Sequence, residues 1–223
     1  MQASVSDARS AGALCCCAII CSVSTPETAE AKRPLVLPIF LIVAGLIGLY
    51  AAFALTLDKF QMLEHPATHL TCDFSVLVQC GENLASAQGA VLGFPNPIIG
   101  LVCWPLVVCV GVALLAGARF PRWFMALFNL GVVLAMALVI FLIITSIYFL
   151  GTLCPWCMIT WTVTIPTFWA VTLYNLKSGN IPVPASARRV AGVLYSWVPV
   201  ITLASYAVVA VLAQIRLDWL HHI

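Results

Sequence analysis

The sequence predicts an all-α integral membrane protein with five transmembrane helices. The 223 residues are 63% hydrophobic and only 8% charged, whereas a soluble domain carries roughly 25% charged residues. The charges leave four long uncharged runs, at 34–57, 83–118, 123–176 and 190–215. A helix needs about 20 apolar residues to cross a bilayer, so each run can hold at least one span. The net charge of +2 gives no indication of nucleic-acid binding.

The uncharged runs differ in how many spans they accommodate. The first and last runs are each long enough for one helix. Pro95 and Pro97 interrupt the second run, so its spanning part is predicted at 97–117. The third run is too long for a single helix and fits two helices that are joined by a tight turn near Gly151. The total is five spans.

The positions of lysine and arginine predict the orientation, because the cytoplasmic ends of membrane spans carry an excess of these residues. With a cytoplasmic N-terminus, the inner side receives Arg9, Lys32, Arg33, Arg119, Arg122, Lys177, Arg188 and Arg189. The outer side receives only Lys59 and Arg216. The opposite topology would invert this bias. The long segment 59–96 and the turn before Cys154 are therefore predicted to face outward.

Three parts are expected along the chain. Residues 1–33 form a cytoplasmic tail that we expect to be disordered, residues 34–176 form a four-helix bundle with an outer loop at 59–96, and residues 177–223 hold a cytoplasmic loop, the fifth span and a short outer C-terminus. The tail contains an apolar stretch with Cys15, Cys16, Cys17 and Cys21. A cleaved secretory signal is the alternative for the tail, and it would reverse every later span.

Ten cysteines fall into three groups. Four lie in the N-terminal tail, and Cys103 and Cys109 lie in the second span, where small buried residues are the simplest interpretation. The remaining four are Cys72, Cys80, Cys154 and Cys157. The predicted topology places these four at the outer face, which is a compartment that permits disulfides.

Cys154-Pro155-Trp156-Cys157 is a Cys-X-X-Cys motif at the outer start of the fourth span. Near a helix N-terminus the unpaired amides and the macrodipole favour a thiolate, and proline suits the first helical position. A thiolate is the species that thiol–disulfide exchange needs. The motif therefore indicates redox chemistry, and a structural disulfide or two membrane thiols are the alternatives.

The outer loop carries a second cysteine pair, Cys72 and Cys80. A mobile loop with two cysteines above a Cys-X-X-Cys motif can carry electrons from the outer compartment to the membrane face. A static loop disulfide and a four-cysteine zinc site are the alternatives, and the zinc site is disfavoured because a closed metal site there has no evident purpose. The sequence has no dinucleotide fingerprint and no haem motif, so exclusion leaves a lipid-soluble quinone as electron acceptor.

These residues together resemble a bacterial member of the vitamin K epoxide reductase family. The resemblance covers roughly residues 36–176 and includes a fifth span, which is typical of the bacterial branch. It is carried by Cys72-Asp73, Cys80, Ser86, the segment Gly-Phe-Pro-Asn-Pro-Ile-Ile-Gly at 93–100, and the late Cys154-X-X-Cys157.

The resemblance implies a four-helix bundle around a quinone, with the outer loop as a cap. It implies that Cys157 contacts the quinone, which is menaquinone or ubiquinone. Cys154 is expected to pair with Cys157 and to exchange with Cys80, while Cys72 is expected to exchange with an external protein. The implied location is the bacterial cytoplasmic membrane, with the active site on the extracytoplasmic side.

Three further residues take roles from the resemblance. Asn96 is expected to hydrogen-bond a quinone carbonyl, and Ser86 to steady the loop near the active site. Some family members have a tyrosine where this chain has Trp161, and an indole donates but does not accept, so packing against the ring is the expected role. Many bacterial relatives carry a fused thioredoxin-like domain that we do not find here, so a separate extracytoplasmic thioredoxin-like partner is expected.

Two other functions compete with a thiol–quinone oxidoreductase that supports disulfide bond formation. The other bacterial quinone-linked disulfide generator has four spans and places its Cys-X-X-Cys in the first outer loop, which does not match the order here. A small transporter or assembly factor with a structural outer disulfide is the alternative from another class. Such transporters often hold ionisable residues within their spans, and the four predicted spans of the bundle contain none.

Overall fold

The computed structural model describes residues 35–65, 70, 72–75 and 77–218, and the regular elements within them are helices. Five of these helical segments are long and apolar enough to cross a membrane, which confirms the predicted fold class. They are α2 (Val36–Glu64), α4 (Pro97–Leu115), α5 (Arg122–Ile144) with its π-helical extension η2 (Thr145–Leu150), α6 (Pro155–Ser178) and α8 (Val198–Leu217). The predicted N-terminal tail and its four cysteines lie outside the described residues.

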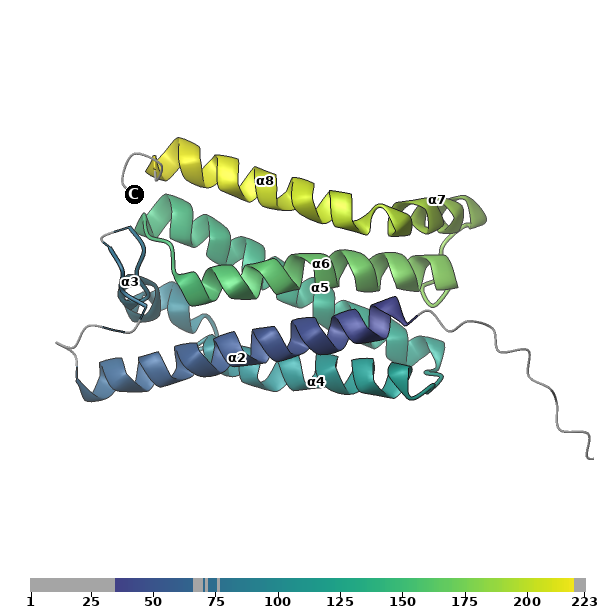
Figure 1. Cartoon of the computed structure of the whole chain (residues 1–223), viewed down its shortest axis with the longest axis horizontal. Coiled ribbons are helices and arrows are strands. Elements are labelled where there is room, and N and C mark those ends of the chain that lie inside the picture. The colour runs from purple at the N-terminus through teal and green to yellow at the C-terminus, as the bar shows by residue number, and fades with distance from the viewer. Residues whose placement is uncertain (1–34, 66–69, 71, 76, 219–223) are drawn as a thin grey trace, which may run out of the picture. The chain divides into compact units, whose positions relative to one another are not determined.

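Three shorter helices complete the elements of the described part (Figure 1). The segment between α2 and α4 contains α3 (Gly81–Ala85) and the 3-10 turn η1 (Ala87–Ala90). The helix α7 (Ala185–Ser196) leads directly into α8. The predicted turn near Gly151 is present, because Gly151 ends η2 with a left-handed φ of 70° that glycine adopts without strain.

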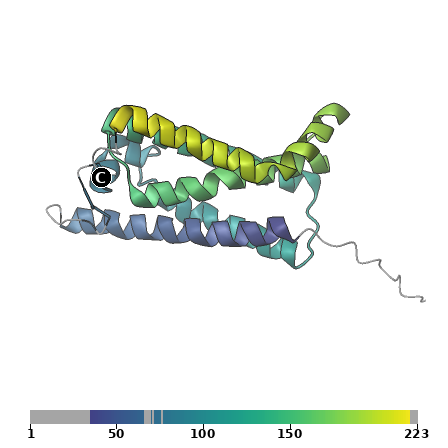
Figure 2. The same cartoon turned by 45° about the horizontal axis from the view of Figure 1, so that its top comes forward.

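The helix α6 occupies the centre of the packing, with α2, α5, α7 and α8 around it (Figures 1 and 2). The most extensive helix pair is α2 with α4. Glycines permit this close approach, since Gly48 faces the indole of Trp104 and Gly100 faces Ala52. Small residues at helix interfaces allow such close packing in membranes, where van der Waals contact is a main source of association.

The fifth span is joined to α6 by two hydrogen bonds, one from a side chain to the backbone and one between two side chains. Pro166 lies inside α6 and has no N–H, so the carbonyl of Thr162 loses its usual partner four residues later. The hydroxyl of Tyr206 on α8 donates to this carbonyl, and Trp169 Nε1 donates to Ser205 Oγ over 3.2 Å. In a bilayer each backbone group must find a protein partner, so α8 compensates for the proline.

The first span is longer than the uncharged run that predicted it. The sequence ends the run at Asp58 and assigns 59–96 to the outer loop, whereas α2 continues to Glu64. Asp58 is buried, with 4% of its surface exposed, and Lys59 Nζ donates to the carbonyl of Leu84 in the loop over 2.7 Å. A charge ends an apolar run but does not end a helix, and here the loop supplies partners for the charged residues.

The two ends of the bundle differ in character. The α2–α4 loop lies at one end, together with the start of α6. The α4–α5 connection with Arg119 and the α6–α7 connection lie at the other end (Figure 1). There Asn175, fully buried, donates to Asn129 Oδ1 over 3.4 Å and accepts from Asn180 Nδ2 over 2.8 Å. This end also carries the basic residues Arg119, Arg122, Lys177, Arg188 and Arg189, whereas Lys59 and Arg216 lie at the end of the cysteine loop.

Replacing Gly48 by alanine is expected to destabilise the α2–α4 pair. An added Cβ would lie 2.2 Å from Trp104 Cε2, and overpacking of this kind costs about 2 kcal/mol. Gly131→Ala in α5 is the control, because no heavy atom lies within 4 Å of the added Cβ. Thermal unfolding in detergent should show a lower midpoint for Gly48→Ala alone. Equal midpoints for both variants would contradict the close packing.

Candidate active site

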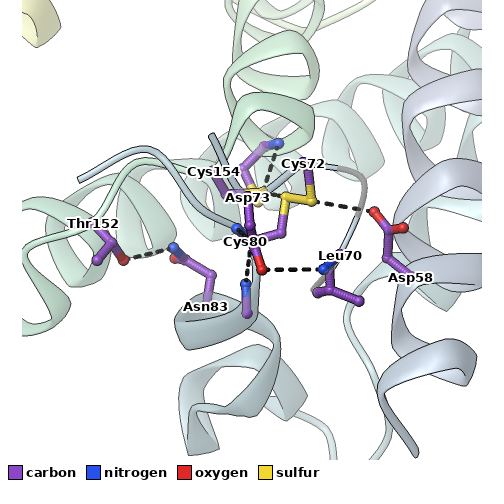
Figure 3. The surroundings of a disulfide bond; sticks show 10 residues. Asp58, Leu70, Cys72, Asp73, Cys80, Asn83, Thr152 and Cys154 are labelled. Carbon is purple, nitrogen blue, oxygen red and sulfur yellow. Dashed lines mark hydrogen bonds between the residues drawn. A yellow bond between two sulfur atoms is a disulfide. The ribbon is translucent and has the colours of Figure 1, made fainter. Parts of the chain in front are cut away.

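The loop between α2 and α4 carries a disulfide that joins Cys72 to Cys80, with a Cα–Cα distance of 5.8 Å (Figure 3). Asp73 organises the backbone around it. Its Oδ1 accepts from the N–H groups of Cys80 over 2.8 Å and of Gly81 over 3.3 Å, and its Oδ2 accepts from the N–H of Leu70 over 3.3 Å. Both cysteines are buried, with exposed fractions of 2% for Cys72 and 0% for Cys80.

The loop is docked onto the residues that precede α6. An isolated parallel bridge pairs Val78 with Leu153. In it the N–H of Leu153 donates to the carbonyl of Leu77 over 2.7 Å, and the N–H of Gln79 donates to the carbonyl of Leu153 over 3.1 Å. Because Gln79 precedes Cys80 and Leu153 precedes Cys154, this register brings the two cysteines together.

A second contact holds the same docking in place. Asn83 on α3 donates from Nδ2 to Thr152 Oγ1 over 3.0 Å (Figure 3). The carbonyl of Thr152 in turn accepts from the hydroxyl of Ser146 in η2. The short segment between η2 and α6 is therefore fixed from both sides, by the loop and by the preceding helix.

Cys154 lies within reach of the loop disulfide. Its Sγ is 3.2 Å from Sγ of Cys80, and the side chain of Cys154 is fully buried (Figure 3). Thiol–disulfide exchange proceeds by attack of a thiolate on a disulfide sulfur, so this sulfur pair is placed for exchange.

The start of α6 favours the thiolate form of Cys154. Cys154 is the N-cap, Pro155 is the first helical residue, and the Sγ of Cys154 accepts from the N–H of Cys157 over 3.4 Å. The pKa of the Cys154 thiol is lowered mainly by a hydrogen bond from the Cys157 side chain. Burial opposes this effect, backbone N–H groups of Cys157 and Trp156 support it, and the charge of Asp58 opposes it.

A cavity of about 700 Å³ lies below the loop, between α4, α5 and α6, and reaches α2. Cys157 is in its wall. Thr164 and Thr167 of α6 also line it, but their hydroxyls donate to the carbonyls of Thr160 over 2.8 Å and Val163 over 2.6 Å. The side-chain hydroxyls are thus satisfied within the helix, and the wall is mainly apolar, as suits a lipid-soluble ring.

The three other predicted site residues also line this cavity. Trp161 is buried, with 6% of its surface exposed. Ser86 caps η1, since its hydroxyl accepts from the N–H of Gly89 over 3.0 Å and donates to the carbonyl of Asn83 over 2.8 Å. The amide of Asn96 bridges two positions of the loop.

The side chain of Asn96 already has two partners in the loop. Its Nδ2 donates to the carbonyl of Gln88 over 2.7 Å, and its Oδ1 accepts from the N–H of Val91 over 3.0 Å. An amide nitrogen carries two donors, so the second N–H of Asn96 is the group that a carbonyl in the cavity could use. Its predicted contact with a quinone stays a prediction.

The sequence profile of the Vitamin K epoxide reductase family matches residues 39–172 of the chain. The chain belongs to this family. The matched region runs from α2 to α6 and contains the loop disulfide, Cys154, Cys157 and the cavity. A search of curated proteins found no match.

Members of the vitamin K epoxide reductase family are oxidoreductases and are in general linked to quinones. The chain is therefore a membrane protein of an oxidoreductase family, and its five candidate spans make it multi-pass. The matched region contains the four cysteines of the loop and of the start of α6, together with Cys103 and Cys109 of α4.

The two cysteines of α4 were predicted to be buried, and this prediction is wrong. Cys103 and Cys109 are both exposed on the helix surface, and Cys103 also lines the cavity. In a membrane protein the outer surface of a helix faces lipid, so a small apolar side chain gains little from turning inward.

Asp58 is a site residue that the sequence analysis did not single out. Asp58, Cys72 and Cys80 each present a ligand atom, and these atoms lie within 4.8 Å of one another. Because the two sulfurs form a disulfide, they offer no thiolate to a metal in this oxidised state, and the geometry favours redox chemistry over a zinc site. The only sequence signal for Asp58 was its position at the end of an uncharged run.

The hydrogen bond from Cys157 predicts how the pKa of Cys154 responds to substitution. Cys157→Ala removes the donor, so the pKa of Cys154 should rise. Cys157→Ser keeps a donor and serves as the matched control. The measurement is the pH midpoint of Cys154 labelling by a methanethiosulfonate, read by mass spectrometry in a Cys80→Ser background. Identical midpoints for both variants would rule out this cause of the lowered pKa.

Proposed function

We propose that the protein oxidises a dithiol on the outer face of the bacterial cytoplasmic membrane and reduces a membrane quinone, and thereby supports disulfide bond formation. The observation that carries the proposal is the 3.2 Å separation between Sγ of Cys154 and Sγ of Cys80. Cys80 is itself joined to Cys72 by a disulfide. A purely structural disulfide has no need of a third sulfur, buried and in contact with it.

The proposed electron path runs inward from the loop. The reduced partner opens the Cys72–Cys80 disulfide and leaves as a disulfide, so two electrons and two protons pass to the loop. The thiolate of Cys80 then attacks Cys154 of a Cys154–Cys157 disulfide and releases Cys157. Cys72 attacks Cys80 in turn, which restores the loop disulfide and leaves Cys154 and Cys157 as a dithiol. Each exchange breaks one S–S bond and forms one.

The cavity supports a quinone, menaquinone or ubiquinone, as the final acceptor. A quinone accepts two electrons and two protons, which is what the Cys154–Cys157 dithiol gives up when it closes. Cys157 and Trp161 line the cavity, so a thiol and an aromatic face are available to a planar ring. Leu106 of α4 and Leu134 of α5 also line it, and they are 59% and 62% exposed. The apolar wall therefore continues to the lipid-facing surface, where a long isoprenoid tail can lie.

A thioredoxin-like protein is the partner that fits the outer end of this path, since its two cysteines supply both electrons at once. Cys72 is only 2% exposed, so the partner reaches it when the loop moves away from α6. Five of the seven basic residues in the described part of the chain lie at the opposite end of the bundle, and the positive-inside rule favours a cytoplasmic location for that end. These arguments favour an extracytoplasmic partner over a cytoplasmic one.

The proposal is tested by following quinone reduction by purified protein, with a reduced thioredoxin-like protein as donor and a short-chain quinone as acceptor. Cys157→Ser should lower the rate by at least about 10³-fold, because the thiol next to the acceptor is lost. A Cys80–Cys154 disulfide should accumulate instead, since that exchange uses only the first cysteine of the motif.

Cys109→Ser is the matched control for this experiment. Cys109 is a membrane thiol of α4 that is exposed and lies outside the cavity wall. The control should reduce quinone at the rate of the unchanged protein. Quinone reduction that survives Cys157→Ser would remove Cys157 from the path, and a donor that stays reduced with every variant would refute the proposed function.

A further inference from the structure

Asp58 places a carboxyl group beside the loop disulfide. It lies on α2, 4% exposed, and its Oδ2 is 3.3 Å from Sγ of Cys72 (Figure 3). This is hydrogen-bonding distance for a sulfur atom. Burying an ionised carboxylate costs free energy unless the charge is compensated or the group takes up a proton, so a buried carboxyl group in contact with a disulfide sulfur is a candidate functional group.

The contact changes its chemistry with the redox state of the loop. A reduced Cys72 carries a thiol proton, and a disulfide sulfur carries none. A hydrogen bond across the same contact therefore has its proton on sulfur in the reduced loop and on the carboxyl group in the oxidised loop. Cys72 is only 2% exposed, so bulk water is poorly placed to take up the proton that Cys72 loses.

We infer that Asp58 is the proton acceptor for Cys72 when the loop disulfide re-forms, an inference that rests on the proposed function. In this step Sγ of Cys72 attacks Sγ of Cys80. The Cys72–Cys80 bond forms, the Cys80–Cys154 bond breaks, and Cys154 leaves as a thiolate with the electron pair. The proton of the Cys72 thiol passes to the Asp58 carboxylate. It returns to Cys72 when the external dithiol next releases Cys72 as a thiolate.

The neighbouring charges fit this assignment. Cys154 faces the same region from the start of α6, and the negative charge of Asp58 acts to raise the Cys154 pKa. Neutralising Asp58 as Cys154 leaves removes a nearby anion at the moment when the new thiolate appears. The carboxylate of Asp73 is engaged with backbone N–H groups of the loop, and Lys59 with the carbonyl of Leu84, so each of these two charges has a separate structural partner.

The test compares Asp58→Asn with the unchanged protein in dithiol oxidation from pH 6 to pH 9. Asparagine keeps the shape of the side chain but accepts no proton. A thiol with the ordinary pKa of about 8.5 is ~3% ionised at pH 7, so the variant should be about 30-fold slower there and within about twofold at pH 9. Acid quenching and non-reducing peptide mapping at pH 7 should show that the Cys80–Cys154 disulfide accumulates.

Two further variants separate proton transfer from structural damage. Asp58→Glu keeps a carboxyl group and should retain a pH profile that runs parallel to that of the unchanged protein. Thr56→Val removes a buried hydroxyl two residues before Asp58 on α2. This hydroxyl donates to the carbonyl of Ala52 over 2.7 Å. The Thr56→Val variant should oxidise the dithiol like the unchanged protein.

The outcomes are distinct. A deficit for Asp58→Asn that is equal at every pH indicates a structural role and overturns the inference, as does a variant with the unchanged rate. Either result leaves the proposed function intact, because the unchanged protein still oxidises the dithiol. An unchanged protein that oxidises no dithiol at any pH contradicts the proposed function and the inference with it.

Discussion

The two hydrogen bonds that pair Leu153 with the loop residues Leu77 and Gln79 determine where the sulfur atoms lie. A loop between two long helices has many conformations available to it, and a disulfide within the loop restricts its shape but not its position. The bridge supplies the position. It pairs Val78, two residues before Cys80, with Leu153, the residue before Cys154, and with this register the sulfurs of Cys80 and Cys154 lie 3.2 Å apart.

The site separates two kinds of chemistry along α6. Cys154 precedes the helix, where the Cys157 side chain and the first backbone N–H groups of α6 lower the pKa of its thiol. Cys157 lies three residues further on, about 4.5 Å along the axis at 1.5 Å per residue, and it lines the apolar cavity. A single turn of helix thus connects a region suited to disulfide exchange with one suited to a quinone ring.

The spans of the fold could be predicted from the sequence because the bilayer imposes a simple rule on length and charge. The Pro97 start of α4 and the Gly151 turn followed from local backbone chemistry. The end of α2 did not, because Asp58 and Lys59 find partners that only the folded loop supplies.

The site likewise has features that the sequence predicts and features that it does not. The proximity of Cys154 and Cys157 could be predicted from the sequence, because their spacing places both residues within one helical turn. The pairing of Val78 with Leu153 joins residues that are far apart in the chain and carry no distinctive side chains. The buried position of Cys72 is also a tertiary effect, produced by packing of the loop against α2 and α6. Sequence patterns report local geometry, and these features depend on long-range contacts.

Peptide mapping of a double variant is the sharpest test of the contact between Cys80 and Cys154, on which the proposed exchange depends. In Cys72→Ser/Cys157→Ser protein, Cys80 and Cys154 each lose their other disulfide partner. Because their sulfurs are in contact, mild oxidation in the membrane should join these two residues in one disulfide, identified by mass spectrometry without reduction. Two free thiols after oxidation, or a disulfide from either residue to another cysteine, would contradict it.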